Sequence, residues 1–139
     1  MAKTKTKKKK NYTYAVGRRK SASARVRLFK GKGTSTVNGK EITKYFPGKV
    51  NKDKWMKPFR TVNAEDGYHV SVRVVGGGKK GQLDAVVHGI SRALAQESED
   101  KFRLPLKKEG LLTRDARVRQ RRMVGTGGKA RRKKQSPKR

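Results

Sequence analysis

The stretch 68–96 reads YHVSVRVVGGGKKGQLDAVVHGISRALAQ and contains, in order, a strand pattern, a glycine run and a helix pattern. Over Tyr68–Val75 the apolar residues fall at every second position, which predicts a strand with one core face and one polar face. Over Gln82–Gln96 the apolar residues recur at intervals of three and four, which predicts an amphipathic helix that packs on the sheet. The two patterns predict a fold that mixes α and β structure.

The residues before this stretch add further strands. Apolar and polar residues alternate over 12–17 and again over 24–29, so we expect two strands at the start of the domain. The pair Asn38-Gly39 lies between Thr34–Val37 and Lys40–Ile42 and favours a type I′ hairpin, because both central residues of that turn need a positive φ.

Two shorter helices are also expected. Val50–Met56 should form a helix that ends before Pro58, since a proline disfavours helical angles in the residue that precedes it. Asp100–Glu109 should form another, despite Pro105. With the strands, these elements predict one α/β domain over residues 11–110.

The charge balance excludes an ordinary soluble enzyme. The chain has 139 residues, of which 40 are Lys or Arg and 10 are Asp or Glu, and its formal net charge is +30. Only 32% of the residues are hydrophobic, so self-repulsion opposes a small core and we expect a polyanionic partner. The net charge is +6 over residues 1–10, +13 over 11–110 and +11 over 111–139. We predict a disordered basic arm at 1–10, in preference to a transit peptide, and an extended basic tail at 111–139.

Metals and cofactors are not expected. The chain has no cysteine, which excludes disulfides, thiolate nucleophiles and Cys-based zinc sites. Its two histidines, His69 and His88, do not have a metal-binding spacing. No apolar run approaches the roughly 18–20 residues of a membrane span. Since no motif suits acid–base or nucleophilic catalysis either, we expect no enzyme activity.

The histidines allow more than one interpretation. His88 is expected on the polar side of the helix, in a surface ladder with Asp84 and Arg92, and a catalytic role is disfavoured. Asp84 is expected in the first turn, where a negative charge complements the helix dipole. His69 lies on the polar face of its strand beside Arg73, where it is either solvent-facing or an RNA contact, and the sequence leaves both open.

The glycine run Gly76–Gly81 matches the dinucleotide-binding pattern GxGxxG only formally. That pattern needs a second strand that ends in an acid, and a P-loop needs Lys and Ser or Thr where this chain has Gln82 and Leu83. Backbone N–H groups at a helix N-terminus beside Lys79 and Lys80 instead favour a phosphate site. The alternative is a glycine turn that only lets helix and strand pack closely.

Among polyanions, RNA is favoured. Membrane binding would need a basic face paired with a broad apolar face, which no segment provides. A DNA-compacting protein, expected to be a dimer or to carry a major-groove helix, is the main rival, followed by a nucleotide-binding enzyme that uses the glycine run. Long basic extensions from a small α/β body can thread between packed RNA helices and order on binding.

Four motifs resemble the universal small-subunit ribosomal protein number nine family, in its bacterial form, over about residues 14–139. They are AVGRRKSA at 15–22 with ARV at 24–26, VNGK at 37–40 with YFP at 45–47, GGG at 76–78 with HGISRAL at 88–94, and GLLTRD at 110–115. The resemblance implies an α+β fold: a two-layer α/β sandwich with a mixed sheet and a left-handed βαβ crossover, plus long basic N- and C-terminal extensions. It also implies a structural role in the small ribosomal subunit, where the partners are ribosomal RNA and neighbouring proteins of the subunit head, with no membrane.

In that family the terminal cations approach the anticodon arm of the peptidyl-site transfer RNA, which carries over to Lys138 and Arg139. Two departures affect this tail. Ala116 stands where the family usually has proline. The ending QSPKR at 135–139 lacks the aromatic residue that usually precedes the last Ser-Lys-Arg, and the inserted Pro137 changes the register of the last two side chains. The expected location is a cytoplasmic bacterial ribosome, with an organellar ribosome as the alternative.

We predict that basic side chains of the strands, the glycine run and the tail contact ribosomal RNA, mostly at phosphates. They are Arg18, Arg19, Lys20, Arg25, Arg27, Lys79, Lys80, Arg114, Arg117, Arg121, Arg122, Arg131, Arg132, Lys133 and Lys134.

Overall fold

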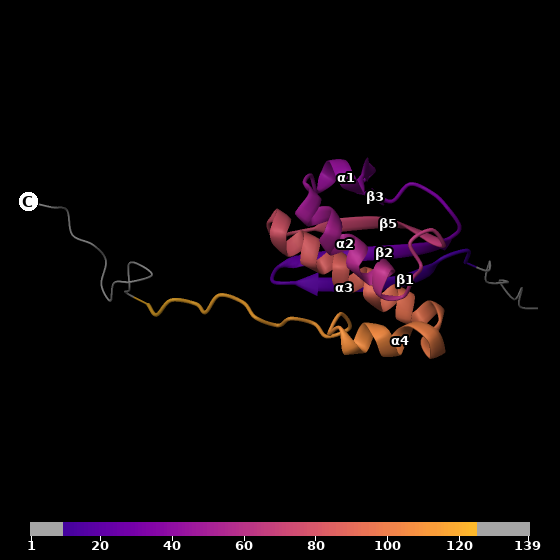
Figure 1. Cartoon of the computed structure of the whole chain (residues 1–139). Helices are drawn as coiled ribbons and strands as arrows, with labels where there is room; N and C mark the ends of the chain where they lie inside the picture. The colour runs from indigo at the N-terminus through magenta and orange to yellow at the C-terminus, as the bar shows by residue number, and fades with distance from the viewer. Residues whose placement is uncertain (1–9, 125–139) are drawn as a thin grey trace, which may run out of the picture.

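The strands form one mixed sheet. A computed structural model of the chain describes residues 10–124 and places five strands in the order β1-β2-β5-β3-β4 (Figure 1). The long strands β1 (Thr13–Arg19), β2 (Ala22–Lys30) and β5 (Tyr68–Val75) pair antiparallel. The short β3 (Thr36–Val37) runs parallel to β5 and antiparallel to β4 (Lys40–Glu41). The mixed sheet confirms the predicted α+β class.

The helices form a second layer on one face of the sheet (Figure 1). The long α3 (Lys79–Glu97) lies across β1, β2 and β5, and it packs against both α2 (Lys49–Thr61) and α4 (Glu99–Lys108). The short α1 (Ile42–Tyr45) follows β4. The parallel strands β3 and β5 are therefore joined through α1 and α2, and the left-handed sense of this crossover stays a prediction.

The core fills the space between the sheet and α3. Val26 and Val70 on the central strands have exposed fractions of 0%, as the alternating pattern predicts. The predicted stripe of α3 is confirmed: Leu83, Val86, Ile90 and Leu94 are buried, with Val87 partly buried against them. Burial of this stripe is the main favourable contribution to folding in a chain with so few apolar residues.

The closest approach of α3 to the sheet occurs where two glycines cross. A Cβ atom added to Gly17 on β1 would lie 2.8 Å from the Cα of Gly89 on α3, and one added to Gly89 would lie 2.6 Å from Cγ2 of Val26. Because neither residue carries a side chain, the two backbones contact each other directly. This crossing fixes the position of α3 on β1.

The predicted hairpin is confirmed. Asn38 and Gly39 have φ values of 50° and 79°, as a type I′ turn requires. The Asn38 amide also continues the pairing of β3 with β5, since Nδ2 donates to the Val74 carbonyl (3.1 Å) and Oδ1 accepts from the Val74 N–H (2.9 Å). Both expected strands are too long: Thr34–Val37 is paired only from Thr36, and Lys40–Ile42 ends at Glu41 because Ile42 begins α1 and is buried.

The predicted end of one short helix is wrong, and the other short helix is shifted by one residue. The helix expected to end before Pro58 continues as α2 to Thr61, with Pro58 inside it. The ring of Pro58 is buried beside Trp55 and Phe59, so the apolar contacts of this face compensate for the missing N–H. The helix expected over Asp100–Glu109 is confirmed with each end one residue earlier.

The long helix begins three residues before Gln82. Its first turn closes on the glycine run, where the Gln82 N–H donates to the Gly78 carbonyl at 2.9 Å. Asp84 therefore lies beyond the first turn, and its predicted role beside the helix N-terminus is wrong. Its carboxylate instead lies 3.6 Å from Nε of Arg19 on β1.

After α4 the described chain, residues 111–124, forms neither helix nor strand. Its first part, as far as Arg117, contacts β1 and α3, and the chain then runs away from the body (Figure 1). Among residues 10–124, no helix is long and apolar enough to cross a membrane.

Candidate nucleic-acid interface

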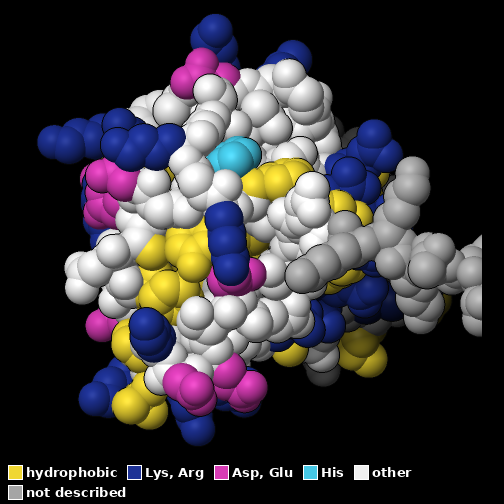
Figure 2. Space-filling view, turned by 90° about the vertical axis from the view of Figure 1, so that its right-hand side faces the viewer, with side chains coloured by type: hydrophobic (Ala, Val, Ile, Leu, Met, Phe, Trp, Pro, Cys, Tyr) yellow, Lys and Arg dark blue, Asp and Glu magenta, His cyan; other side chains and the backbone are white. Residues whose placement is uncertain are grey.

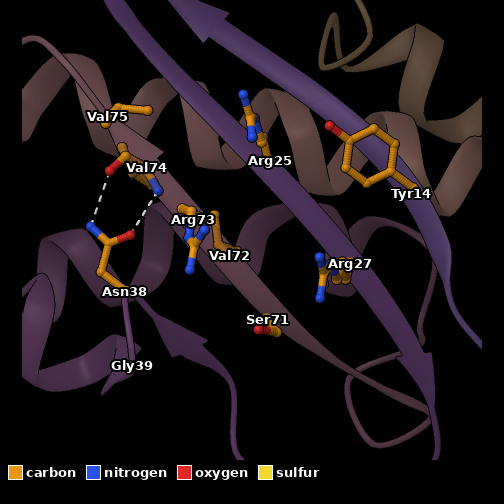
Figure 3. Close-up of a pocket in the computed structure, with 10 residues that line it drawn as sticks. All are labelled: Tyr14, Arg25, Arg27, Asn38, Gly39, Ser71, Val72, Arg73, Val74 and Val75. Atoms are coloured by element: carbon orange, nitrogen blue, oxygen red, sulfur yellow. Dashed lines mark hydrogen bonds between the residues drawn. The ribbon is translucent and has the colours of Figure 1, made fainter.

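The sheet face opposite the helices is lined by cations. We call Tyr14, Arg25, Arg27, Ser71 and Arg73 the open sheet face; with Asn38, Gly39 and the end of β5 they line a trough of about 640 Å³ (Figure 3). Strand alternation places these side chains here, because their neighbours in sequence point into the core. The three arginines project from the adjacent strands β2 and β5.

The charges of the open sheet face have no acidic counterpart. Arg25 lies directly opposite Arg73 in the register of β2 and β5, and Arg27 lies between Tyr14 and Ser71. None of the nine ion pairs found among residues 10–124 involves these arginines, and β1, β2 and β5 contain no acidic residue. Like charges directly opposite on two strands are destabilising, so the face favours a bound anion.

An aromatic row continues the face beyond Arg27. The rings of Phe29 and His69 stack with centroids 5.2 Å apart, and Tyr12 lies 5.7 Å from Phe29 with Arg27 over its ring. The ring of His69 is also 3.0 Å from the Gly31 carbonyl, through Nδ1. His69 is therefore held by the protein; an RNA contact at this residue stays a prediction.

The glycine run packs against the β1–β2 turn. Gly76 and Gly77 have φ values of 77° and 66°, and a Cβ at Gly76 would lie 2.6 Å from the Ser21 carbonyl oxygen. A Cβ at Gly77 would lie 3.1 Å from that of Ala22. These contacts explain the glycines by close packing, the alternative that the sequence left open. A phosphate at this helix N-terminus stays a prediction.

Of the two lysines beside the glycine run, one is held by the protein. Nζ of Lys79 lies 3.3 Å from the centroid of the Tyr45 ring, in a cation–π contact. The Tyr45 hydroxyl donates to Oε1 of Gln82 (2.9 Å), and Nε2 of Gln82 donates to the Gly76 carbonyl (3.0 Å). These contacts attach α1 to the start of α3. The neighbouring Lys80 is exposed.

Arg19 fixes the start of the C-terminal tail. Its side chain is only 14% exposed, and Nη1 lies 2.8 Å from a carboxylate oxygen of Asp115 while donating to the backbone carbonyl of Arg117 at 3.0 Å. Arg117 in turn pairs with Asp115 at 2.7 Å, which holds the pKa of the Asp115 carboxyl well below its ordinary range. The positive charges of Arg19 and Arg117 are thus partly matched within the chain.

His88 joins the same segment to β1. Its ring is partly buried; Nδ1 accepts from the Arg18 N–H at 3.3 Å and Nε2 lies 3.3 Å from the Leu112 carbonyl, so Nε2 carries the proton. Burial lowers the pKa of His88 below its ordinary value, and the Leu112 carbonyl opposes this shift. Arg92 donates to the Val16 carbonyl at 2.5 Å. The predicted surface ladder is therefore wrong, since its members contact β1 instead of one another.

Charges of both signs occur near the start of β1 and the end of β2, at the end of the sheet opposite the β1–β2 turn. Glu97, at the end of α3, accepts from Thr13 (2.5 Å) and lies 2.6 Å from Nζ of Lys30, and these bonds lower the pKa of its carboxyl. Figure 2 shows that basic, acidic and apolar side chains are interspersed on this side of the molecule. No cluster of three or more potential metal ligands occurs in the part of the chain that the structure describes.

The structure brings together only some of the predicted contact residues. Arg25 and Arg27 share the open sheet face, and Arg18, Lys20 and Lys80 are exposed near the β1–β2 turn. Along the described tail Arg114, Arg121 and Arg122 are exposed. The prediction missed Tyr14 and Arg73 as members of the open sheet face, although the alternation over 68–75 already placed Arg73 on the polar side. Six predicted residues lie outside the described range: Arg131, Arg132, Lys133, Lys134, Lys138 and Arg139.

Comparisons with known proteins agree on one family. The family described as ribosomal protein S9/S16 matches residues 17–139. "Small ribosomal subunit protein uS9" of Thermus thermophilus is 48% identical over 109 residues, which cover 78% of this chain and 84% of the relative. The protein of the same name from Renibacterium salmoninarum is 45% identical over 95 residues, covering 68% of this chain and 57% of the relative, so this chain spans little more than half of it. The protein of the same name from Rickettsia rickettsii is 45% identical over 109 residues, which cover 78% of this chain and 67% of the relative. On this evidence the chain belongs to the ribosomal protein S9/S16 family.

Proposed function

We propose that this chain is a structural, non-enzymatic constituent of the small ribosomal subunit, that it binds ribosomal RNA in the subunit head, and that its tail reaches the peptidyl-site transfer RNA. Family membership supports the first statement, since the relatives are named small-subunit ribosomal proteins. The observation that carries the second is the open sheet face, whose arginines make no ion pair within residues 10–124.

The exposed cations supply affinity without sequence readout. Each Lys or Arg that neutralises a phosphate releases a counterion, so affinity depends steeply on salt. The best-placed phosphate contacts are the exposed cations that make no ion pair within residues 10–124: Arg18, Lys20, Arg25, Arg27, Lys80, Arg114, Arg121 and Arg122. Arg19, Lys79 and Arg117 are held by intramolecular contacts, so their main role is to position the β1–β2 turn, α1 and the tail.

The tail is the part proposed to reach transfer RNA. Its described start is fixed to β1 and α3 through Arg19 and His88, so it leaves the body in a defined direction. Two terminal cations, Lys138 and Arg139, would touch backbone phosphates without reading sequence. Neighbouring proteins of the subunit head are the expected protein partners. The expected location is a bacterial cytoplasmic ribosome, and an organellar ribosome is the alternative.

Sedimentation tests the structural role. An epitope-tagged full-length copy is run through a high-salt sucrose gradient of a cell lysate, where salt removes adventitious polycations. We expect it to stay stoichiometric with the small subunit. A copy that moves to the top, or that follows DNA, would overturn the proposal in favour of a DNA-compacting protein. Binding to ribosomal RNA and to duplex DNA at matched salt then gives an independent comparison.

A truncation tests the tail. We expect removal of Lys138 and Arg139 to leave subunit assembly unchanged and to weaken retention of peptidyl-site transfer RNA. Small subunits that carry the truncated chain are compared with those that carry Lys54→Gln, which removes one exposed charge from α2. Equal transfer RNA affinity in the truncated and control subunits would refute the tail contact.

A further inference from the structure

We propose that the open sheet face binds an unpaired nucleotide of RNA, with a phosphate between Arg25 and Arg73 and a base against the ring of Tyr14. This inference rests on the proposed function and specifies which kind of RNA the face takes. The open sheet face would thus contact both a phosphate and a base, whereas for the tail and the β1–β2 turn only phosphate contacts are proposed.

The first step is the phosphate position. Arg25 and Arg73 are register partners on β2 and β5, both exposed and on the same side of the sheet (Figure 3). Cβ atoms of directly opposed residues lie about 5 Å apart, so two guanidinium groups can approach one phosphate from both sides. A phosphate there removes the repulsion that the two cations otherwise maintain.

The second step is the base position. Tyr14 lies on β1 opposite Arg27, one cross-strand row away from Arg25, and is 45% exposed. Successive rows on one face are about 6.8 Å apart along an antiparallel strand and neighbouring strands are about 4.8 Å apart, so the backbones of Tyr14 and Arg25 lie roughly 8 Å apart, a span that one nucleotide and a long arginine side chain can bridge. None of the ring contacts found among residues 10–124 engages the Tyr14 ring, whereas Phe29 stacks on His69 and also contacts the tilted ring of Tyr12.

The third step is the shape of the site. The trough measures about 640 Å³, within the range of small-ligand sites. Asn38 closes one side, and its amide is already held by both backbone groups of Val74, so this wall is rigid (Figure 3). A trough with a fixed wall, a cation pair and an exposed aromatic ring suits a single nucleotide that projects out of a helix.

A duplex would use this face poorly. Bases inside an A-form helix are stacked on each other, so their faces cannot reach Tyr14, and a duplex would contact the arginines only through phosphates. Unpaired bases can stack on an aromatic side chain whatever their identity. The face therefore predicts a preference for single-stranded over double-stranded RNA at equal numbers of phosphates.

The test compares two fluorescent probes, a single-stranded hexauridylate and an RNA duplex with the same number of phosphates. Binding to the full-length protein is measured by fluorescence anisotropy at fixed salt. Stacking on one base accounts for at least about a fivefold difference in affinity, so Tyr14→Leu should reduce the affinity for the single strand by at least about fivefold. The same change should leave the duplex unaffected. Tyr14→Phe keeps the ring and should stay within about twofold of the original.

The phosphate position has its own variant. Arg73→Gln should reduce the slope of log affinity against log salt for the single strand by about 0.7. Lys54→Gln on α2 removes one exposed charge from the helix side and should leave the single-strand affinity within about twofold. Matching thermal melts show that each variant is folded.

Two outcomes would overturn the inference while leaving the proposed function intact. One is an unchanged single-strand affinity for Tyr14→Leu; the other is an equal loss for Lys54→Gln and Arg73→Gln, which would indicate binding by overall charge. Failure of the proposed function would look different, because the original protein would then leave the small subunit in the high-salt gradient.

Discussion

Replacement of Gly17 by alanine should strongly destabilise the fold. The new Cβ would lie 2.8 Å from the Cα of Gly89 and closer still to the Ala85 carbonyl oxygen. Carbon atoms pack best at about 3.5–4.0 Å, so α3 must move away from β1 by at least about 0.7 Å. The neighbours are backbone atoms of a helix in contact with three strands, so no single side chain can move aside to make room.

The size of the effect follows from this displacement. Overpacking usually costs about 1–3 kcal/mol, and a clash between two backbones belongs at the upper end, near about 3 kcal/mol. Domains of about 100 residues lose roughly 4 °C or more in Tm per kcal/mol, so we expect Tm to fall by at least about 10 °C. Such a loss is a large share of a typical stability of about 5–15 kcal/mol.

The assay is thermal unfolding of the full chain by circular dichroism at a fixed moderate salt concentration. Gly78→Ala is the matched control, because a Cβ there meets nothing within 4 Å and the φ of −94° suits any residue. The control should melt within about 3 °C of the original protein. If Gly17→Ala also melts within that range, α3 does not contact β1 through these glycines and the crossing described above is wrong.

Three further changes test other contacts. Burial lowers the pKa of His88 below 6.5, so the unfolded chain binds more protons than the folded one near this pH. The free energy of unfolding should therefore fall as the pH drops below about 6.5. His88→Gln should flatten this pH dependence, as measured by urea unfolding between about pH 5 and 8. Glu97 pairs with Lys30 and accepts a hydrogen bond from Thr13, and both contacts lower the pKa of its carboxyl. Glu97→Gln should therefore reduce stability by about 1–2 kcal/mol at neutral pH and by less as the pH falls below 4.5; an equal loss at low and neutral pH would contradict this. The buried indole N–H of Trp55 has no hydrogen-bond partner within the described residues. Trp55→Phe should therefore change the free energy of unfolding by only about 1 kcal/mol, because no hydrogen bond is lost. Truncation of a buried Trp to Ala typically costs about 3–5 kcal/mol.

Strand positions could be predicted because they depend on local periodicity. The alternation over 68–75 and the Asn38-Gly39 pair describe β5 and the hairpin turn almost to the residue. Helix ends depended on tertiary contacts that a local pattern does not contain. Pro58 continues α2 because its ring is buried, and α3 begins at Lys79 because Gly78 accepts the first helical hydrogen bond.

Composition alone could not predict which cations pair within the chain and which stay exposed. Arg19 and Arg25 are both strand arginines, yet Arg19 is only 14% exposed and bound to Asp115, whereas Arg25 is exposed and faces Arg73. What separates them is the direction of the side chain together with the three-dimensional positions of the few acids. Alternation indicates the direction, but only the folded chain shows that a tail residue, Asp115, returns to β1.

The placement of the acids connects folding to binding. Acidic residues lie on the helices, the loops, β4 and the start of the tail, and β1, β2 and β5 contain none. Several of these acids, such as Asp84, Glu97 and Asp115, pair with a cation of another element and so hold elements together. The open sheet face therefore keeps its mutual repulsion in the free protein, and a bound polyanion that removes this repulsion binds the folded chain better than the unfolded one. By linkage, bound RNA should stabilise the fold by an amount that grows with the logarithm of its concentration divided by Kd, which lets a chain with a net charge of +30 depend less on its small core.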